Sequence, residues 1–520
     1  MSEGDMFQTY FEDRENGGLY HAVSEDWAEV VDTNKLAEEQ FSAARTNVIG
    51  AMITHDPEAV TDAEKAVDEV ITRFEDKKNG GYYLAADKDW TITQKEKHLC
   101  HTSEIFGVLM HLYEVNKKDS YLAKALEFLD IALERAWDEK NGGFFSLYSE
   151  DWTPEGDIKD LGTQAAMLQH MNGSWKDGMD SPLGAQSAYH RSRAEAFGDL
   201  LIEKAEDRVN GGFYTSFTGD WTPAATEKAV SQIASLGLTL YFHYHNMGPS
   251  IWGPRKGSHA YTGRPYPSVY RYLGPAPSVE PVTQRAYLFG KKVMEIGDIL
   301  IRHAWDEDLG GFYTSLAEDL SPADENKSVS TQIACLMALN VAYRLTGFKR
   351  FQQKLAEAVI TMEEKCFDPE NSGTYVSFDR SWEPTVRDKI CGPNLMVVGI
   401  LSMMAPVSSG MEVAGAQLTI WIGPRVQEIK QNSSTACSVT VQNQGFESKR
   451  VRVGGLTTPS RWMSPGDITF DLAPHEVTTY TLTITPPAGM PPGDYFFEVT
   501  CMEEGAVAEY AAAGGKLIIR

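Results

Sequence analysis

Cysteine is scarce in this chain, and its spacing gives no metal-binding pattern. Six cysteines occur among 520 residues, without a CxxC pair or any other spacing typical of zinc ligands. We therefore expect buried thiols and no metal site. Cys437 and Cys501 form the one pair that could face each other across a β-sandwich.

Long apolar runs and positive charge are also lacking. No stretch of about 18 apolar residues occurs, so no membrane span is predicted. The polar, acidic start MSEGDMFQTYFED lacks the features of a secretory signal, and a cytoplasmic location is expected if Met1 is the natural start. With 47 basic against 73 acidic residues, the formal net charge is −26. This charge argues against nucleic acids and anionic membranes as partners.

What the chain does contain is one pattern repeated six times. An Asp is followed after four residues by a Gly, and nine positions later by a Trp, which is Leu320 in the fifth copy. The segment between, such as NGGFYTSFTGDW, predicts a tight turn that opens a β-hairpin and is capped by the Asp. A calcium loop is the alternative, but Ser24 stands where the frame beginning at Asp13 requires a glutamate. The repeated acids are Asp13, Asp76, Asp138, Asp207, Asp306 and Asp368.

Each interval between these acids is long enough for two helices of about 18 to 22 residues. The first helix of a pair is predicted at 97–115 and 327–345, and the second at 121–137 and 351–366. Apolar residues at three- and four-residue spacing mark the first type as amphipathic. They are Ile105, Val108, Leu109 and Leu112.

The number of helices predicts a closed ring. Five intervals give ten helices, 388–404 gives an eleventh, and the segment before Asp13 resembles the end of a twelfth. Residues 1–405 are therefore predicted to form an (α/α)6 barrel of six hairpins, interrupted by an inserted loop at 248–283. Alternating runs after a linker predict an antiparallel β-sandwich at 414–520. Its segment 438–499 resembles the immunoglobulin-like modules appended to carbohydrate-active enzymes, and a packing or spacer role is the alternative.

Polar residues recur where the first helix of each pair begins. A Lys opens each of these helices, and an amide follows it in most repeats. If the helix starts converge on one mouth, these amides are candidates for binding a polyhydroxylated or anionic ligand, although packing within the repeat is the alternative. The candidate amides are Gln164, Gln232, Gln332 and Asn394, with Gln40 in the first repeat.

The GGFY hairpin, the acidic-aromatic turn and the Lys with its polar neighbour resemble the N-acylglucosamine 2-epimerase superfamily. This resemblance covers about 400 residues. It implies a six-hairpin toroid that moves a proton next to a sugar carbonyl with histidines and without a cofactor. Where the family often has KDLYGHAF, this chain has Lys159-Asp-Leu-Gly-Thr-Gln164, so an amide replaces the expected histidine.

Two other groups supply candidates for the site. His101 and Glu104 share a helix face at three-residue spacing, as a base with its orienting carboxylate or as a surface ion pair. The insertion 248–283 combines aromatic and basic residues, including Trp252, Arg255 and Arg264. It is interpreted either as a lid over an anionic saccharide or as an arm that contacts another subunit.

Two classes of function follow. The first is an enzyme acting on a small carbohydrate or sugar acid, an isomerase or epimerase before a lyase or glycoside hydrolase. For a hydrolase, the candidate carboxylates are Asp160, Asp388 and Glu104. The second is a noncatalytic binding subunit, with the insertion or the β-sandwich as its contact surface or as the interface of a homo-oligomer.

Overall fold

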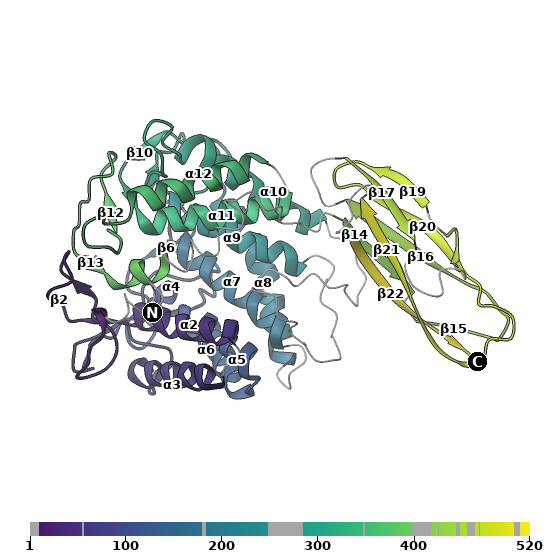
Figure 1. Cartoon of the computed structure of the whole chain (residues 1–520), viewed down its shortest axis with the longest axis horizontal. Coiled ribbons are helices and arrows are strands. Elements are labelled where there is room, and N and C mark those ends of the chain that lie inside the picture. Colours follow the sequence, from purple (N-terminus) through teal and green to yellow (C-terminus); the bar gives the residue numbers. More distant parts are fainter. Residues whose placement is uncertain are drawn as a thin grey trace. The chain divides into compact units, whose positions relative to one another are not determined.

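The computed structural model describes most of the chain as two compact units. The described residues are 10–54, 57–178, 184–247, 284–346, 349–397, 418–424, 426–443, 448–454, 463–466, 468–503 and 510–520. The first, here called the helical unit, comprises Met1–Leu240, Glu295–Val341 and Lys349–Glu412. The second, here called the strand-rich unit, comprises Tyr241–Met294, Ala342–Phe348 and Val413–Arg520. Figure 1 shows a helical part followed by a strand-rich part. The insertion 248–283, with Trp252, Arg255 and Arg264, lies outside the described residues.

The helices occur in successive pairs, as the sequence predicts. The predicted ranges 97–115 and 327–345 correspond to α4 with α5 and to α11, and Ile105, Val108, Leu109 and Leu112 are all buried. Residues 391–397 and 10–11 are helical at the two ends of the series. The pairs are α2 (Ala37–Thr54) with α3 (Pro57–Phe74), α4 (Leu99–Thr102) and α5 (Glu104–Asn116) with α6 (Asp119–Ile131) and η1 (Ala132–Ala136), α7 (Leu161–Gly178) with α8 (Gly184–Ala205), α9 (Val230–Met247) with α10 (Gln284–Ile299) and η2 (Leu300–Ala304), and α11 (Val329–Thr346) with α12 (Lys349–Lys365).

Each repeat opens on a turn that its aspartate caps. Asp13 Oδ1 accepts hydrogen bonds from the backbone N of Glu15 and Asn16, at 3.1 and 3.0 Å. The corresponding aspartates of the other five repeats make the same two backbone contacts. The predicted capping role is confirmed, because these carboxylates satisfy turn N–H groups.

A buried lysine completes each capped turn. Lys97 Nζ lies 2.9 Å from Asp76 Oδ2, with both side chains almost fully buried, and it sits over the Tyr83 ring. The other five repeats contain the same Lys–Asp pair at 2.7 to 3.0 Å. The repeated lysines therefore neutralise the turn aspartates, and the packing interpretation holds for them. The paired strands that contain these lysines also link consecutive repeats.

The links between repeats run through the whole series and return to its start. In the helical unit, β3 (Lys35–Leu36) pairs with β4 (Ala85–Ala86) of the next repeat, and β6 (Ile158–Asp160) pairs with β7 (Ser216–Thr218). The last repeat pairs with the first, because β13 (Lys389–Ile390) lies antiparallel to β1 (Ala22–Val23). The toroid is therefore closed. The remaining links are the Lys97–Tyr148 bridge, β8 (Lys228–Ala229) with β9 (Ser315–Leu316), and β11 (Lys327–Ser328) with β12 (Ser377–Phe378). The hairpins also contain β2 (Val30–Asp32), β5 (Ile92–Gln94) and β10 (Pro322–Asp324).

The repeated tryptophans make the same connection through their side chains. Trp90 Nε1 donates to the carbonyl of Asn16 in the preceding turn at 2.8 Å, and Trp27 Nε1 closes the ring by donating to Asn371 at 2.9 Å. The glycine two residues after Asn371, Gly373, has φ +72°, and a Cβ there would lie 2.5 Å from the Trp27 ring. Glycine is needed at this position both for backbone conformation and for space.

Gly373→Ala should therefore destabilise the helical unit more than a similar change at a glycine in open space. Gly156 is the matched control, because it has φ +95° but no neighbour within 4 Å of an added Cβ. We expect about 1–2 kcal/mol from the left-handed backbone in both variants. Overpacking against Trp27 should add about 1–3 kcal/mol in Gly373→Ala alone. Urea unfolding followed by circular dichroism measures both, and equal losses would contradict the close contact.

The strand-rich unit contains two sheets. One has the order β14 (Leu418–Gly423), β16 (Thr435–Asn443), β20 (Val477–Ile484) and β18 (Met463–Ser464). The other has the order β15 (Val426–Ile429), β22 (Tyr510–Ile519), β21 (Gly493–Glu503), β17 (Lys449–Gly454) and β19 (Ile468–Leu472). The predicted purely antiparallel sandwich is not confirmed, because β15 pairs parallel with β22.

Residues of both sheets share one hydrophobic cluster in this unit. Ile422 and Val439 come from the first sheet, and Val451 and Val453 come from the second. Cys437 and Cys501 also belong to this cluster, as free thiols. The expectation of buried cysteines is confirmed for this pair, whereas Cys100 is exposed.

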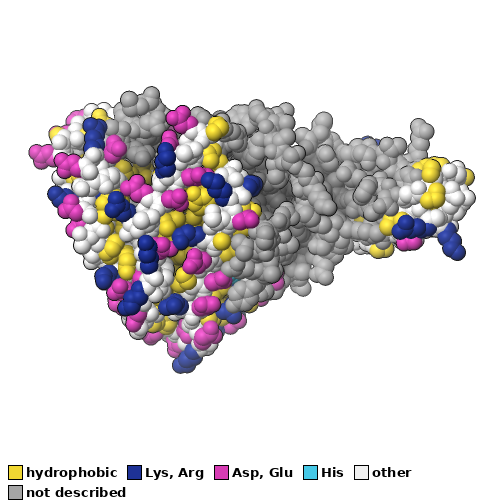
Figure 2. Space-filling model, turned by 90° about the horizontal axis from the view of Figure 1, so that it is seen from below, with side chains coloured by type: hydrophobic (Ala, Val, Ile, Leu, Met, Phe, Trp, Pro, Cys, Tyr) yellow, Lys and Arg dark blue, Asp and Glu magenta, His cyan; other side chains and the backbone are white. Residues whose placement is uncertain are grey.

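The surface of the helical unit mixes both signs of charge. Figure 2 shows one face on which Lys and Arg side chains alternate with Asp and Glu. On this face the acidic side chains are thus interspersed with basic ones and form no single patch. Within the described ranges, every helix is too short or too polar to cross a membrane.

Candidate active site

The repeated amides face the backbone of their own repeats. Gln164 is fully buried; its Oε1 accepts from Phe144 N at 2.9 Å and its Nε2 donates to Phe144 O at 2.7 Å. Gln332 holds Phe312 in the same way, and Asn394 holds Thr374. The proposed substrate-binding role of Gln164, Gln332 and Asn394 is therefore corrected, since their polar atoms are used to hold the hairpin against the helix.

Gln232 differs from the other three amides. It stands one residue earlier in its repeat and is only half-buried. Its Oε1 accepts from the backbone N of Gly162, in the first turn of α7, at 3.2 Å. Gln232 therefore links two neighbouring first helices and remains partly accessible.

The larger of two cavities in the described part of the helical unit, here called the main cavity, lies at the amino ends of several first helices. Its volume is about 510 Å³. The wall is formed by the first three turns of α2, the start of α11, the α4–α5 region, His21 of the first hairpin and residues 390–396. The predicted convergence of helix starts on one opening is thus found for these repeats. The polar lining residues are His21, Glu38, Glu39, Ser42, Arg45, Thr46, Cys100, His101, Glu104 and Ser330.

His101 and Glu104 both line this cavity, but they are not each other's partners. His101 Nδ1 pairs with Glu38 Oε2 from the first turn of α2, and Glu104 pairs with the guanidinium of Arg45. The predicted His101–Glu104 pair is therefore wrong, while the placement of both residues in one site is found. Two ion pairs between α2 and the α4–α5 region replace it.

The carboxylate of Glu38 favours the protonated form of His101. Its hydrogen bond raises the pKa of His101, although partial burial opposes the shift. The neighbouring His98 ring stacks edge-on at 4.2 Å between ring centroids. Burial, together with the positive charge of His101, lowers the pKa of His98 to about 4, so His98 is neutral near neutral pH. Among these two histidines, His101 is the stronger base and the one with an orienting acid.

A second histidine–carboxylate pair lines the same cavity. His21 Nδ1 lies 3.0 Å from Glu39 Oε1, and this hydrogen bond raises the pKa of His21. The same Glu39 oxygen accepts from Gly392 N at 3.1 Å, which ties the first repeat to the last. The cavity therefore contains two imidazoles, each held by an adjacent acid of α2.

Arg45 is the cationic group of this site that stays charged at any working pH. Burial would raise the pKa of Glu104, but Arg45 outweighs it and holds the pKa below its usual value. His170 lies close to this pair, and burial lowers its pKa to about 4. Glu104 is therefore an anion that holds Arg45 in place on the cavity wall.

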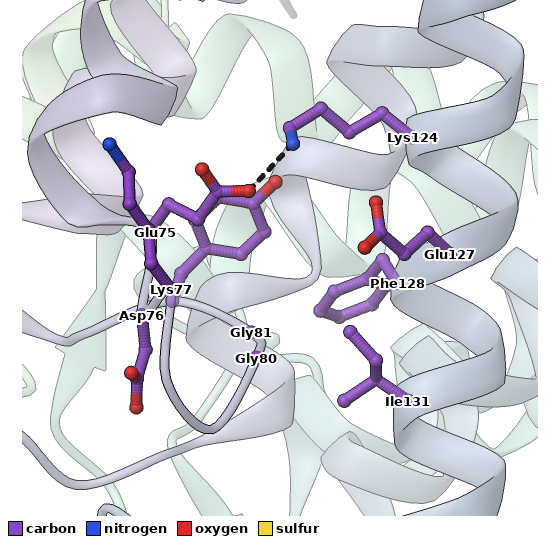
Figure 3. A pocket seen from close by; sticks show the side chains of 10 residues that line it. Glu75, Asp76, Lys77, Gly80, Gly81, Lys124, Glu127, Phe128 and Ile131 are labelled. Carbon is purple, nitrogen blue, oxygen red and sulfur yellow. Dashed lines mark hydrogen bonds and ion pairs between the residues drawn. The ribbon is translucent and has the colours of Figure 1, made fainter.

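A smaller cavity of about 230 Å³ lies between the turn of the second repeat and α6. Figure 3 shows its lining, with the ion pair between Glu75 and Lys124 at 2.6 Å. Glu127 and Phe128 of α6 also line it. Because this cavity is lined by no histidine among its ten residues, it offers no base suited to proton transfer at neutral pH.

Comparison with known proteins agrees with the ring of helical hairpins. Residues 3–172 match the family model of N-acylglucosamine 2-epimerase. A sugar epimerase from a ruminal bacterium superposes with a TM-score of 0.62 at 13% identity, over 79% of this chain and 97% of that chain. The helical unit has the N-acylglucosamine 2-epimerase fold.

Other solved structures share this epimerase fold. A D-mannose isomerase superposes with a TM-score of 0.60 at 12% identity, over 78% of this chain and 95% of that chain. A GH76 α-mannanase from Bacteroides thetaiotaomicron superposes with a TM-score of 0.51 at 10% identity, over 78% and 95%. At these identities the likeness establishes the fold alone, and function must be argued from the site.

Four residues of this epimerase-fold site are missing from the sequence-based candidates: His21, Glu38, Glu39 and Arg45. All come from the first repeat, whose helix begins with two adjacent acids. These two adjacent acids, together with a histidine in the preceding hairpin, were the sequence signal from which this part of the site could have been predicted. Within the described ranges, the side chains provide no cluster of three metal-ligating residues.

Proposed function

We propose that the chain is a sugar epimerase or isomerase that moves a proton at the carbon next to the sugar carbonyl. The observation that carries this proposal is the pair formed by His101 and Glu38 on the wall of the main cavity. A histidine next to a carboxylate is a suitable general base, and Arg45 lies in the same lining. The match of residues 3–172 to the epimerase family supports the same reaction class.

The chemistry assigns one role to each group. Neutral His101 takes the proton from the carbon next to the carbonyl, and Glu38 stabilises the imidazolium that forms. Arg45 stabilises the negative charge that develops on the carbonyl oxygen, giving an enediol-type intermediate. Delivery of the proton to the neighbouring carbon, with the O2 hydroxyl proton passing to O1, gives the ketose. Delivery of a different proton to the same carbon from the opposite face gives the epimer.

Epimerisation needs a second proton donor, and we assign this role to His21. The His21 ring is held by Glu39, and its raised pKa favours the protonated, donating form. Isomerisation to the ketose needs only one acid–base group. Formation of the epimer would therefore indicate that His21 takes part, whereas formation of the ketose alone does not require it.

Hydrogen exchange tests the proposal directly. The protein is incubated in D₂O with D-mannose, D-glucose and an N-acylglucosamine, and the proton at C2 is followed by NMR. We expect loss of the C2 proton signal together with appearance of the epimer or ketose. The matched control is Glu127→Gln, which changes a carboxylate in the smaller cavity and should exchange at the wild-type rate. Absence of exchange with every sugar would contradict the proposal.

A noncatalytic sugar-binding subunit is the second candidate. It is favoured by one observation: none of the described residues that line the main cavity is Phe, Tyr or Trp, the side chains that usually wall a sugar site. Sugar binding without exchange would support it. The hydrolase alternative is weaker, because Asp160 caps α7 through Thr163, Asp388 is exposed, and of the three predicted acids only Glu104 lines the cavity.

A further inference from the structure

Among the described residues that line the main cavity, Glu39 has a buried side-chain oxygen without a hydrogen-bond partner. Glu39 is almost fully buried, with 2% of its surface exposed. Its Oε1 is engaged by His21 and by the backbone N of Gly392. Its Oε2 is buried and, among the residues that the structure describes, has no partner. Glu39 nevertheless belongs to the cavity lining.

An unpartnered buried carboxylate oxygen is unfavourable, and native proteins rarely retain one without a reason. Burial raises the pKa of Glu39, and the neighbouring Glu38 raises it further, while His21 and Gly392 N oppose the shift. Gly392 lies beside the side chain, since an added Cβ there would be in ordinary van der Waals contact with Glu39 Cγ at 3.5 Å. The protein thus holds an acceptor ready for a donor that enters the cavity.

We propose that Glu39 Oε2 accepts a hydrogen bond from a hydroxyl group of the sugar, and that Glu39 thereby determines specificity. This inference rests on the proposed function only in taking the cavity as the sugar site. A hydroxyl fits better than a phosphate or carboxylate, because Glu38, Glu39 and Glu104 line the cavity with Arg45 as the single Lys or Arg side chain in the described lining. Neutral sugars are therefore favoured over sugar phosphates and uronates.

Binding of a sugar that cannot react tests this inference without catalysis. The probe is 1,5-anhydro-D-mannitol, which lacks a carbonyl, together with its monodeoxy analogues, and Kd is measured by calorimetry. In the wild type, one analogue should bind about tenfold or more weakly than the parent, since a hydrogen bond to a charged group is lost. In Glu39→Gln, which keeps an oxygen for His21 and Gly392 N but has a neutral amide in place of the charged acceptor, the difference between the same analogue and the parent should be clearly smaller than in the wild type.

Glu127→Gln is the control and should keep the wild-type discrimination. The inference is overturned if Glu39→Gln discriminates as the wild type does, or if the wild type binds none of these probes. A second measurement guards against misfolding of the variant. In the wild type, carboxyl NMR should show the pKa of Glu39 falling when the parent binds but not when that one analogue binds, because a donor favours the charged form. An unchanged pKa would also overturn it.

The two proposals fail separately. If discrimination between the probes does not depend on Glu39, but the wild type still exchanges the C2 proton, only the hydroxyl contact is ruled out. If discrimination does depend on Glu39, but the wild type shows no exchange, only the enzymatic reaction is ruled out.

Discussion

Replacing His101 by asparagine should lower kcat/KM for the C2 exchange reaction by about 10²–10⁴-fold. That range is the usual contribution of a positioned general base. Asparagine has similar size and can still donate to Glu38, but it cannot accept a proton from carbon. His101 is partly exposed to the cavity, so the fold should persist, as judged by circular dichroism.

The pH profile separates proton transfer from a structural effect. Because Glu38 raises the pKa of His101, the neutral base forms only as the pH rises through that raised value. Activity should therefore increase with pH over this range. Glu38→Gln should shift the rise to lower pH and reduce the maximal rate. A His101→Asn variant with near wild-type exchange, or a Glu38→Gln profile at the wild-type position, would rule out this base.

Asp76→Asn should destabilise the helical unit by about 3–5 kcal/mol, the usual effect of leaving a buried charge without its partner. Lys97 is fully buried, and its Nζ lies 2.9 Å from Asp76 Oδ2. The asparagine can still accept from the turn N–H groups, but it no longer neutralises the ammonium group. The loss is measured by urea unfolding followed by circular dichroism.

Two further variants identify the cause of this loss. Asp76→Asn combined with Lys97→Met removes both charges and should recover much of the stability, since methionine packs well in a buried position. Lys95→Met removes an exposed lysine that lies 3.5 Å from Glu150, and should change stability by about 0.5 kcal/mol or less. If Lys97→Met restores nothing to Asp76→Asn, the buried charge is not the reason.

The helical fold was predictable because its signals are local and repeated. The turn chemistry around Asp13 and Gly18 and the apolar stripe of α5 each specify one element, and sixfold repetition makes a closed ring the natural way to cover every apolar face. The parallel pairing of β15 with β22 was not predictable in this way. It joins residues about ninety positions apart, and no turn between neighbouring strands encodes it.

The site was predicted only in part, for a related reason. Three-residue spacing suggested that His101 pairs with Glu104, but its partner Glu38 lies 63 positions earlier in the chain. Repetition was misleading for the amides. The amide at the position of Gln164 recurs because it holds the hairpin of its own repeat, as Gln332 and Asn394 also do, whereas Glu39 and Arg45 belong to a single repeat and carried no periodic signal.

Closure of the ring has a consequence for synthesis and folding. The main cavity combines residues 21–46 with residues 390–396, so its wall remains incomplete until the last helical segment has left the ribosome. Contacts such as Glu39 with Gly392 span 353 positions, and such distant contacts form late and slowly. A nascent chain thus acquires this cavity at the very end of assembly of this unit, in a single joining event between its oldest and its youngest segments.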